Sequence, residues 1–382
     1  MALYKTLTTT PPTPFYYYDM TLLRATLQQC KREASKYNFH VHYAMKANVE
    51  PRILHEVQRA GLGADCVSGW EVKSAINNGF SPSQIVFAGV GKSDREMRWA
   101  LSQNIFAFNC ESLEELEILN EIADDMGKVA TVALRINPDI EPNTHPHIST
   151  GQCESKFGIS YTETNTVIAN LEKYKNLNII GLHFHIGSQI RDMKSFEELA
   201  LRSNIITKWF EDQGIEIKYL NMGGGLGVDY LNPDKEPIPD FGAYFKVFAD
   251  NLKLSPNQSV HFELGRSLVA QCGELITQVL FTKDTGSGSH IAIVDAGMTE
   301  LIRPAFYQAH HMIENLSATD RPLMKFSIAG PICESSDFFA RSIDFPATKR
   351  GDLLAIRSIG AYGSIMSSHY NLRPTIPSYF TK

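Results

Sequence analysis

Residues 40–68, HVHYAMKANVEPRILHEVQRAGLGADCVS, decide the fold class of this chain. The stretch opens on an apolar run, continues with a helical pattern after Glu50-Pro51, and closes on a second apolar run. Proline is favoured at the first position of a helix, so we expect the helix to begin at Pro51. Parallel neighbours in a sheet need a crossover connection of this kind. The stretch therefore predicts one parallel strand–helix–strand unit.

The same alternation of short apolar runs and helical patterns continues through the first two thirds of the chain. A second helix start, Asn109-Cys110-Glu111-Ser112, precedes the helical pattern LEELEILNEI. About eight apolar runs occur, with room for a helix after each of the first seven. They are HVHYAMKAN (from His40), LGADCVS (Leu62), IVFAGVG (Ile85), IFAFNC (Ile105), VATVALRIN (Val129), IIGLHFHIG (Ile179), IEIKYLNMGGG (Ile215) and VHFELGR (Val260). Eight parallel strands with helical crossovers predict an α/β fold, a (β/α)8 barrel of the TIM type.

The pattern changes after about Ser267. Predicted strands now follow one another with glycine, serine and proline turns between them and little helix. They lie in the segments CGELITQVLFTKD, SHIAIVDAG, LMKFSIAGP and DLLAIRSIG. This pattern predicts a second, mostly antiparallel β domain. We expect a barrel domain over residues 30–268 and a β-rich domain that combines residues 1–29 with 269–382.

The composition of the 382 residues argues against several classes of protein. Lys and Arg total 36 against 42 for Asp and Glu, and this net charge of −6 leaves no basic excess for a nucleic-acid partner. No apolar stretch approaches the roughly 20 residues of a membrane span, and the N-terminus lacks the roughly 7–15 apolar residues of a secretory signal. The six cysteines contain no C-x-x-C pair, which argues against a metal site or a disulfide framework. We expect a cytoplasmic protein whose cysteines are mostly buried, with no membrane, nucleic-acid or metal partner.

Polar residues end several of the predicted strands. They matter because the active site of a TIM-type barrel lies at the carboxyl ends of its strands. Taken singly, each would be explained by an ordinary ion pair or a hydrogen-bonded core position. Their convergence on one rim indicates a functional site. These residues are Lys46, Asp65, Arg135, His183, His185, Gly223 to Gly225 and Glu263.

Three consecutive glycines, Gly223 to Gly225, suit a turn whose backbone N–H groups cradle a phosphate. They do not form a dinucleotide-binding fingerprint, because Val228 stands where the third glycine of GxGxxG belongs. Gly91-Lys92-Ser93 likewise is not the end of a P-loop, because Val86 stands at the position of the upstream glycine. The glycines therefore indicate a phosphorylated cofactor other than NAD or ATP.

Lys46 lies in the apolar context YAMKAN, where desolvation lowers the pKa of an amine. Such an amine can form an imine with a carbonyl group. A lysine alone is more often a surface residue, but this one accompanies a phosphate cradle and the strand-end carboxylate Glu263. Pyridoxal phosphate needs an imine lysine, a phosphate cup and an acid at its ring nitrogen. The three features together predict pyridoxal phosphate as the cofactor.

Nearly the whole chain resembles the barrel-type (fold III) pyridoxal-phosphate-dependent decarboxylases. The resemblance rests on motifs in a fixed order, which is far more specific than any single motif. They are YAMKAN, GADCVSGWE, FGI, GLHFHIGSQI, NMGGGLG, FELGR, DAGMTELIRPAFY, GPICESSDF and GAYG. One motif departs from the family, because Glu263-Leu264-Gly265-Arg266 lacks the proline of the usual Glu-Pro-Gly-Arg.

The resemblance implies roles for the matching residues around the cofactor. Lys46 would bind it covalently and His185 would stack on its ring. Glu263 would keep the ring nitrogen protonated, so that the ring can accept an electron pair. The remaining contacts to the cofactor and its surroundings would be Ser188, Gly225, Arg266 and Tyr362, while Asp65, Glu71 and Arg135 match nearby polar positions without an assigned role.

For the reaction, the resemblance implies decarboxylation of a small amino acid, meso-2,6-diaminopimelate, to L-lysine and carbon dioxide, the last step of lysine biosynthesis. Cys333 would be the second catalytic residue, as proton donor, and Glu334 would contact the distal ammonium of the substrate. The other substrate contacts would be Arg266, Arg303, Tyr307 and Tyr362, with arginine suited to clamp a carboxylate. In this family the cysteine segment comes from the neighbouring subunit. The resemblance therefore implies a homodimer with shared active sites that the β-rich domain completes.

Other functions stay open on the sequence alone. A carboxynorspermidine decarboxylase would share the barrel, the lysine and the glycines, but the CESSD segment and the Arg303 to Tyr307 segment argue against it. A barrel-type racemase would need a second acid or base on the opposite face of the cofactor. A non-catalytic, cofactor-binding relative would commonly lack Lys46 or Cys333. His183-x-His185 also places two imidazoles on one strand face, as a zinc hydrolase would.

Overall fold

The computed structural model describes residues 11–138, 156–286, 288–318 and 320–381. The chain divides into two compact units. The barrel unit comprises Leu27–Gly227 and Asp240–Gly265, and the β-rich unit comprises Met1–Thr26, Val228–Pro239 and Arg266–Lys382. The contacts of the 228–239 segment place it in the β-rich unit, although its sequence position lies inside the barrel range expected above.

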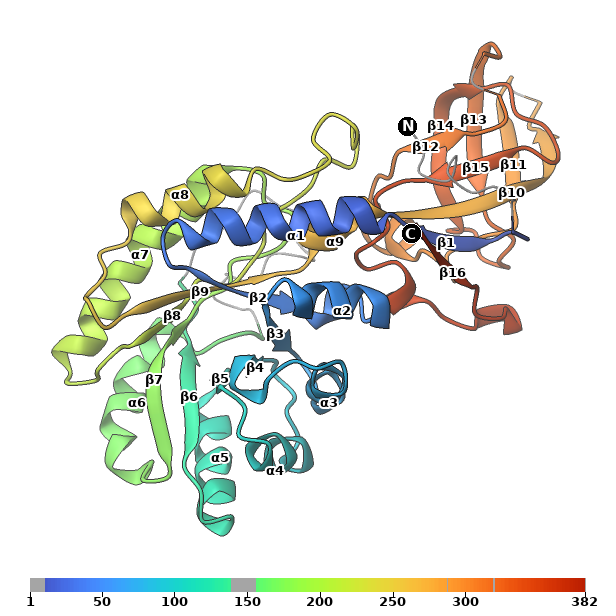
Figure 1. The fold of residues 1–382 in the computed structure, drawn as a ribbon. Coiled ribbons are helices and arrows are strands. Elements are labelled where there is room, and N and C mark those ends of the chain that lie inside the picture. Colours follow the sequence, from blue (N-terminus) through green and yellow to red (C-terminus); the bar gives the residue numbers. More distant parts are fainter. Residues whose placement is uncertain (1–10, 139–155, 287, 319, 382) are drawn as a thin grey trace. The chain divides into compact units, whose positions relative to one another are not determined.

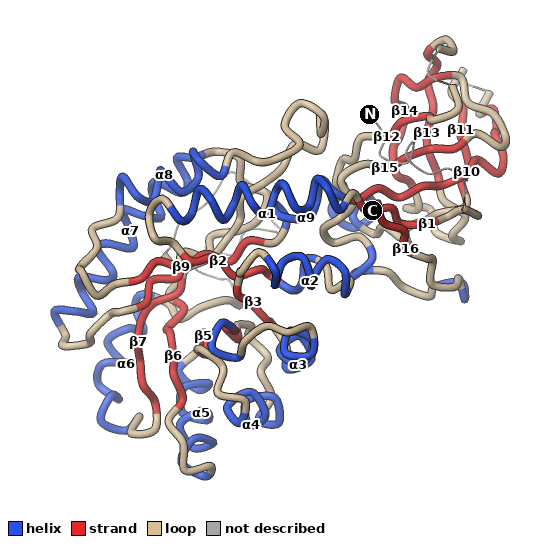
Figure 2. The backbone as a smooth tube through the Cα atoms, viewed as in Figure 1, coloured by secondary structure: helices blue, strands red, loops and turns tan. Residues whose placement is uncertain are grey.

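Eight parallel strands close into a barrel in the order of the sequence, from β2 to β9 (Figures 1 and 2). Strand β2 pairs with β9 to close the ring, in a register that sets Tyr43 opposite Leu264. The strands are β2 (His40–Ala44), β3 (Gly63–Cys66), β4 (Ile85–Phe87), β5 (Ala107–Cys110), β6 (Ala130–Arg135), β7 (Leu177–His183), β8 (Tyr219–Asn221) and β9 (Ser259–Leu264). Each predicted apolar run overlaps one strand, so the TIM-type barrel is confirmed.

A helix follows each of the first seven barrel strands, as the spacing predicts. Helix α2 begins at Pro51 and buries Ile53, Leu54 and Val57, while α5 begins after Ser112, whose side chain accepts the N–H of Glu115. Both starts agree with the sequence signals. The helices that precede or alternate with the strands are α1 (Met20–Ser35), α2 (Pro51–Arg59), α3 (Gly69–Asn77), α4 (Asp94–Ser102), α5 (Leu113–Asp125), α6 (Thr164–Asn170), α7 (Met193–Asp212) and α8 (Phe241–Asn251).

The β-rich unit is built on one eight-stranded sheet. Six strands follow the order β12-β15-β10-β11-β13-β14, β1 pairs with β10, and β16 pairs with β1. Most neighbours are antiparallel, whereas β11 with β13 and β1 with β16 are parallel. The elements are β1 (Phe15–Tyr18), β10 (Gly273–Asp284), β11 (His290–Val294), β12 (Ile313–Asn315), β13 (Leu323–Ala329), β14 (Phe338–Pro346), β15 (Leu353–Ile356) and β16 (Ser378–Phe380), with the short helices α9 (Arg266–Val269) and α10 (Arg303–Tyr307). The mostly antiparallel domain is confirmed.

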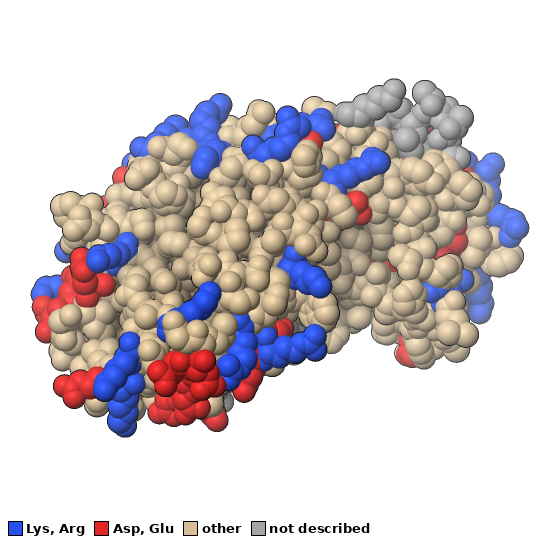
Figure 3. Space-filling model, turned by 60° about the horizontal axis from the view of Figure 1, so that its bottom comes forward, with Lys and Arg blue, Asp and Glu red and all other residues tan. Residues whose placement is uncertain are grey.

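Among the described residues, no helix is both long and apolar enough to cross a bilayer. On the face drawn in Figure 3, basic and acidic side chains are interspersed, and the largest acidic group borders on basic side chains. Charges of both signs thus occur on this face, in line with the small net charge of −6.

Candidate active site

Lys46 lies in the short 3₁₀ turn η2 (Met45–Ala47), directly after β2 at the carboxyl end of the barrel. Its Nζ atom is 3.9 Å from Oδ2 of Asp65 on β3, and its side chain is 41% exposed. Gly265, at the end of β9, packs against this turn, because a Cβ there would lie 3.0 Å from Cβ of Ala47. The turn therefore presents an accessible amine beside a carboxyl group and close to the last barrel strand.

Glu263 on β9 is a buried carboxylate whose two oxygens both accept hydrogen bonds. Oε1 accepts from Nδ2 of Asn109 at 3.0 Å and of Asn221 at 2.6 Å, and Oε2 accepts from Nε2 of His183 at 3.0 Å. Burial acts to raise the pKa of Glu263, but the charge and hydrogen bond of His183 outweigh it and hold this pKa well below its ordinary value. The carboxylate is therefore ionised at neutral pH and fixed in one orientation.

Asp65 is the opposite case. Its side chain is buried, and neither of its oxygens has a hydrogen-bond partner among the described residues. Burial raises the pKa of Asp65 well above its ordinary value, and the negative charge of Glu263 adds to this effect more than Lys46 reduces it. The site thus holds two carboxyl groups whose pKa values are shifted in opposite directions, a pattern typical of acid and base roles at active sites.

The glycine loop 223–225 packs tightly on the segment after β7. A Cβ at Gly223 would lie 2.2 Å from the carbonyl oxygen of Phe184, and a Cβ at Gly225 would lie 2.5 Å from that of Gly187. Both loop glycines have positive φ, at 66° and 105°, so a side chain is excluded at each position. Ser188 directly follows Gly187, which brings the predicted residues Ser188 and Gly225 to the same end of the barrel.

His185 is a neutral imidazole beside this loop. Its Nδ1 accepts the N–H of Gly224 at 3.2 Å. Burial lowers the pKa of His185 well below its ordinary value, and the positive charges of Lys46 and Arg135 lower it further. A flat, uncharged ring in this position suits stacking on an aromatic cofactor.

Arg135, at the end of β6, is held by Glu111. Its Nη1 donates to both Glu111 oxygens, at 2.7 and 2.9 Å. Glu111 also accepts the backbone N–H groups of Gly89 and Gly158, at 2.9 and 3.0 Å. Arg135 is therefore a fixed positive charge at the rim, since its partner is anchored to two further loops.

Two other polar residues of the barrel have structural roles. Oε2 of Glu71 accepts the N–H of Val67 at 2.8 Å, so this carboxylate closes the turn before α3. Lys92 is buried, and its Nζ donates to Glu115 and to the carbonyl oxygens of Gly89 and Asn109. Lys92 thus ties loops together, in agreement with the conclusion that its sequence is not part of a P-loop.

The β-rich unit contains a second group, in which two buried arginines flank Tyr230. Nη1 of Arg266 donates to the Tyr230 hydroxyl at 2.7 Å, and the guanidinium of Arg303 lies 4.7 Å from the centre of the Tyr230 ring. The guanidinium of Arg266 also lies 4.8 Å from the ring centre of Tyr362. Burial acts to raise the pKa of Tyr230, but the two arginines outweigh it and lower this pKa. We name these four residues the arginine cluster, a concentration of buried positive charge suited to bind a carboxylate.

His311 fixes Arg303 from the other side. Its Nε2 accepts from Nη1 of Arg303 at 2.7 Å, and its Nδ1 donates to the carbonyl oxygen of Arg357 at 2.8 Å. Burial lowers the pKa of His311 well below its ordinary value, and Arg303 adds to this effect, so the ring is a neutral acceptor. Tyr307 ends the same short helix, α10, that begins with Arg303.

Cys333 and Glu334 lie on an exposed loop between β13 and β14. The N–H of Cys333 donates to Oδ1 of Asn371 at 2.9 Å, and the Tyr370 hydroxyl donates to Oε1 of Glu334 at 2.8 Å. Cys333 is exposed, whereas the other described cysteines, Cys30, Cys66, Cys110 and Cys272, are buried free thiols. Cys153 lies outside the described residues.

The barrel residues fit pyridoxal phosphate. Lys46 would hold it covalently, and the unpartnered oxygens of Asp65 leave acceptors beside that amine. Glu263 offers an ionised carboxylate, and the glycine loop offers a backbone surface on which side chains are excluded. An imine lysine, an acid for the ring nitrogen and a phosphate cradle therefore occur together in one unit.

Sequence reasoning missed several residues that shape the site. Asn109 and Asn221 lie at the ends of predicted strands, as the predicted site residues do, so their position is a usable signal. Tyr230 and His311 carry no such signal, because neither ends a predicted strand and each acts through an arginine, 36 positions away for Tyr230 and 8 for His311. His183 was selected with His185 as a possible metal pair. In the structure it bonds Glu263, and the described residues contain no group of three or more His, Cys, Asp or Glu that could hold a metal ion.

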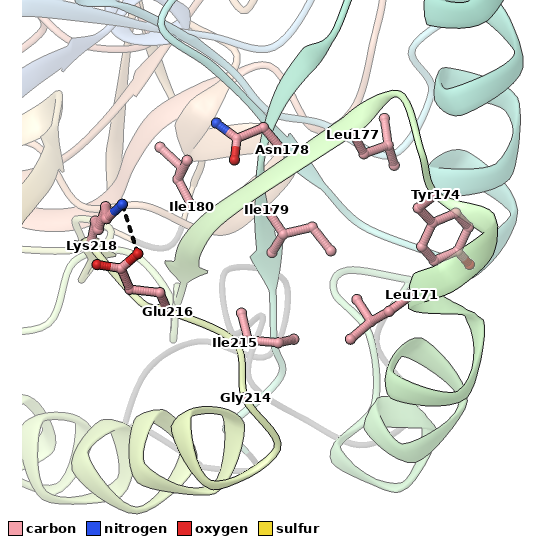
Figure 4. Close-up of a pocket in the computed structure, with 10 residues that line it drawn as sticks. All are labelled: Leu171, Tyr174, Leu177, Asn178, Ile179, Ile180, Gly214, Ile215, Glu216 and Lys218. Carbon is pink, nitrogen blue, oxygen red and sulfur yellow. Dashed lines mark ion pairs between the residues drawn. The ribbon is translucent and has the colours of Figure 1, made fainter.

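A separate cavity of about 360 Å³ opens between η6 (Leu171–Lys173), the start of β7 and the segment before β8. Figure 4 shows Leu171, Ile179 and Ile215 directed toward its interior, with the ion pair of Lys218 and Glu216 at one side. These residues lie at the amino-terminal ends of the barrel strands. Polar catalytic groups gather at the opposite end of such barrels, so this cavity is not the candidate active site.

Comparison with known proteins agrees with this arrangement. Residues 22–270 match the family described as "Pyridoxal-dependent decarboxylase, pyridoxal binding domain". A diaminopimelate decarboxylase of Bacteroides thetaiotaomicron is 50% identical over 368 residues, which cover 96% of this chain and 95% of that protein. One of Aquifex aeolicus is 42% identical over 97% of this chain and 87% of its own length. The crystal structure of diaminopimelate decarboxylase from Helicobacter pylori complexed with L-lysine superposes with a TM-score of 0.92 at 38% identity, covering 99% of this chain and 94% of that one.

Proposed function

The chain belongs to the diaminopimelate decarboxylases, within the pyridoxal-dependent decarboxylase family, and we propose that Lys46, Glu263 and Cys333 carry its conversion of meso-2,6-diaminopimelate to L-lysine and carbon dioxide. The observation that supports this proposal best is the pairing of an accessible amine with an ionised, fully hydrogen-bonded carboxylate at the carboxyl end of the barrel. These are the two groups that a pyridoxal enzyme needs first.

Pyridoxal phosphate, when bound, supplies an aldehyde that joins an amine and a ring that accepts the electron pair left by carbon dioxide. Lys46 would hold this aldehyde, and Glu263 would hold a proton at the ring nitrogen, because its carboxylate stays ionised. His185 would offer its neutral ring to the cofactor. Ser188 and the glycine loop at Gly225 would hold the phosphate, and Arg266 and Tyr362 would contribute to these surroundings.

The arginine cluster is the proposed site for the distal end of the substrate. Arg266 and Arg303 bind the distal carboxylate, since two buried guanidinium groups next to each other favour an anion. Tyr307 and Tyr362 border this carboxylate. Glu334 accepts the distal ammonium. A diamine-forming decarboxylase has no distal carboxylate to bind, so the paired arginines favour diaminopimelate over such substrates.

We also propose a homodimer in which each active site takes its Cys333 loop from the other copy. Cys333 donates the proton that replaces the departing carboxylate. The loop is exposed in the single chain, and the segment that binds it carries the exposed side chains of Tyr370, at 49%, and Leu372, at 95%. In this proposal residues 30–268 bind the cofactor, and residues 1–29 with 269–382 complete the active site and the dimer. The free described cysteines suit a reducing compartment such as the cytoplasm.

The proposal is tested by incubating the purified protein with meso-2,6-diaminopimelate. We expect carbon dioxide and lysine in equal amounts, and borohydride should fix the chromophore to the peptide that contains Lys46. Lys46→Ala should lower the rate at least about 1,000-fold, whereas Lys73→Ala, on the surface of α3, should not change it. Lysine release by Lys46→Ala at the parent rate would refute the mechanism. Preference for carboxynorspermidine in a competition assay would favour the alternative decarboxylase.

A further inference from the structure

The segment of residues 368–373, between β15 and β16, has no role in the mechanism so far. It binds the loop between β13 and β14 that carries Cys333 and Glu334. The Tyr370 hydroxyl donates to Oε1 of Glu334 at 2.8 Å, and the Cys333 N–H donates to Oδ1 of Asn371 at 2.9 Å. Two consecutive residues of this segment thus bind two consecutive residues of the loop. The loop's backbone and its carboxylate are both held from the same side.

The loop and the segment are anchored to one common base, the turn of residues 295–300 after β11. Asp337, at the far end of the loop, accepts the N–H of Met298 at 2.6 Å and that of Ile332 at 2.8 Å. The segment is attached through the N–H of Ser368, which donates to the carbonyl oxygen of Thr299 at 3.0 Å. Nη2 of Arg373 also donates to the carbonyl oxygen of Asp295, at 2.8 Å. The loop and the segment are therefore bound to each other and both to the same turn, which fixes the position of Tyr370 relative to Glu334.

The backbone of the segment adopts an unfavourable conformation to make these contacts. Asn371 and Leu372 both have positive φ, at 54° and 55°. Asparagine tolerates this region, but for leucine it costs on the order of 1–3 kcal/mol. Leu372 gains no burial in return, because it is 95% exposed in the single chain. Such strain persists where surrounding contacts impose it, and it is concentrated at functional sites.

The hydrogen bond from Tyr370 restricts the orientation of the Glu334 carboxylate. Glu334 is exposed, and an exposed glutamate is free to adopt several rotamers. The Tyr370 hydroxyl occupies Oε1 and leaves Oε2 to accept a second donor. The hydrogen bond from Tyr370 to Glu334 and the charge of Glu334 raise the pKa of Tyr370, so its hydroxyl stays a donor throughout the neutral range. A carboxylate held in this way has one fixed oxygen, and its other oxygen can accept a hydrogen bond from an ammonium group.

We infer that Tyr370 is a specificity-determining positioning residue, whose hydroxyl orients Glu334 to select substrates that carry a distal ammonium group. This inference rests on the proposed function and deepens it. Tyr370 acts through Glu334, whereas Asn371 fixes the backbone at Cys333. Removal of the Tyr370 hydroxyl should therefore weaken the binding of the distal ammonium and leave the reacting end of the substrate unaffected.

The test compares Tyr370→Phe with the parent enzyme, both loaded with cofactor. We expect the KM for meso-2,6-diaminopimelate to rise about tenfold, the loss typical of one hydrogen bond to a charged group, while kcat changes less than about twofold. The inhibition constant of 2-aminopimelate, which keeps both carboxylates but lacks the distal amine, should not change. Tyr37→Phe, a comparably exposed tyrosine of the barrel unit, is the matched control and should leave all three constants unchanged.

A double-mutant cycle adds a second readout. In a Glu334→Ala background, Tyr370→Phe should have no further effect on KM, because the carboxylate that it orients is absent. The inference is overturned if Tyr370→Phe leaves KM unchanged, if it weakens 2-aminopimelate equally, or if its effect persists without Glu334. If the parent enzyme does not decarboxylate meso-2,6-diaminopimelate, the proposed function and this inference are both overturned. A fully active parent with an unaffected Tyr370→Phe overturns this inference alone.

Discussion

Asp65 and Glu263 are two carboxyl groups that the barrel places under opposite electrostatic conditions. Glu263 accepts three hydrogen bonds and has a lowered pKa, while Asp65 accepts none from described residues and has a raised pKa. Burial is common to both, so the neighbours account for the difference: the charge and hydrogen bond of His183 lower the pKa of Glu263, whereas the charge of Glu263 raises that of Asp65. The same chemical group thus serves as a permanent anion in Glu263 and as a carboxyl that more readily keeps its proton in Asp65.

Glu263→Gln tests the role of the permanent anion. Glutamine keeps the shape but not the charge, so in the proposed role nothing would hold a proton at the cofactor's ring nitrogen, and kcat should fall by about 100-fold or more. Carbon dioxide release measures the effect, and the absorbance of bound cofactor shows that the variant is loaded. Glu216→Gln, at a surface ion pair with Lys218, is the control and should be fully active. Activity of Glu263→Gln within threefold of the parent would contradict the assignment.

At the scale of elements, adjoining strands β2 and β9 bring histidines together inside the barrel. Nε2 of His42 and Nδ1 of His261 are 2.9 Å apart, and the two rings stack with centres 5.2 Å apart. Burial lowers the pKa of His42 from 6.5 to about 4 and that of His261 to about 2. The barrel therefore packs these rings in their neutral form. Protonation of the rings in an acidic solution would destabilise this packing.

This packing predicts a pH-dependent stability. Between pH 6.5 and about 4 the unfolded chain binds a proton at His42 that the folded chain does not, so the free energy of unfolding rises with pH in this window and falls as the solution is acidified. The contribution of His42 is at most about 3 kcal/mol. The free energy of unfolding can be measured at several pH values by denaturant titration followed by circular dichroism. The slope of this free energy against pH should be shallower for His42→Gln than for the parent. His55→Gln, on the exposed face of α2, should keep the parent slope, and equal slopes for all three proteins would refute the argument.

At the scale of the whole molecule, a shared active site makes a prediction about mixtures of subunits. Lys46→Ala and Cys333→Ala should each be nearly inactive. In a mixed dimer of the proposed kind, one site would carry both changes and the other neither, because lysine and cysteine would come from different copies. Random pairing makes half of the dimers mixed, so about one quarter of parent activity should return when the two variants are expressed together.

The control for this experiment is co-expression of Lys46→Ala with Glu263→Gln. Both residues lie in the barrel unit of one copy, so no site free of changes can form, and activity should stay at the level of the separate variants. If the lysine and cysteine variants together are no more active than either alone, each site is built from a single chain.

Much of the fold was predictable because its signals are local. The apolar runs and the helix starts at Pro51 and Ser112 are properties of neighbouring residues, and they gave all eight barrel strands. Strands β1, β12 and β16, each of three or four residues, and β14 were missed. Short strands gain their stability from partners such as β10, which pairs with β1 although the two are far apart in the sequence.

The sequence by itself determined the alternation of strands and helices and the chemical groups at the strand ends, because both depend on the order of residues along the chain. Only the tertiary structure decided which partners those groups have. Asn109 and Asn221 hold Glu263, and Tyr230 lies between Arg266 and Arg303, through contacts between residues that are 36 to 154 positions apart. Hydrogen bonds, burial and pKa shifts act over a few ångströms in space, and no pattern of neighbouring residues specifies such distances.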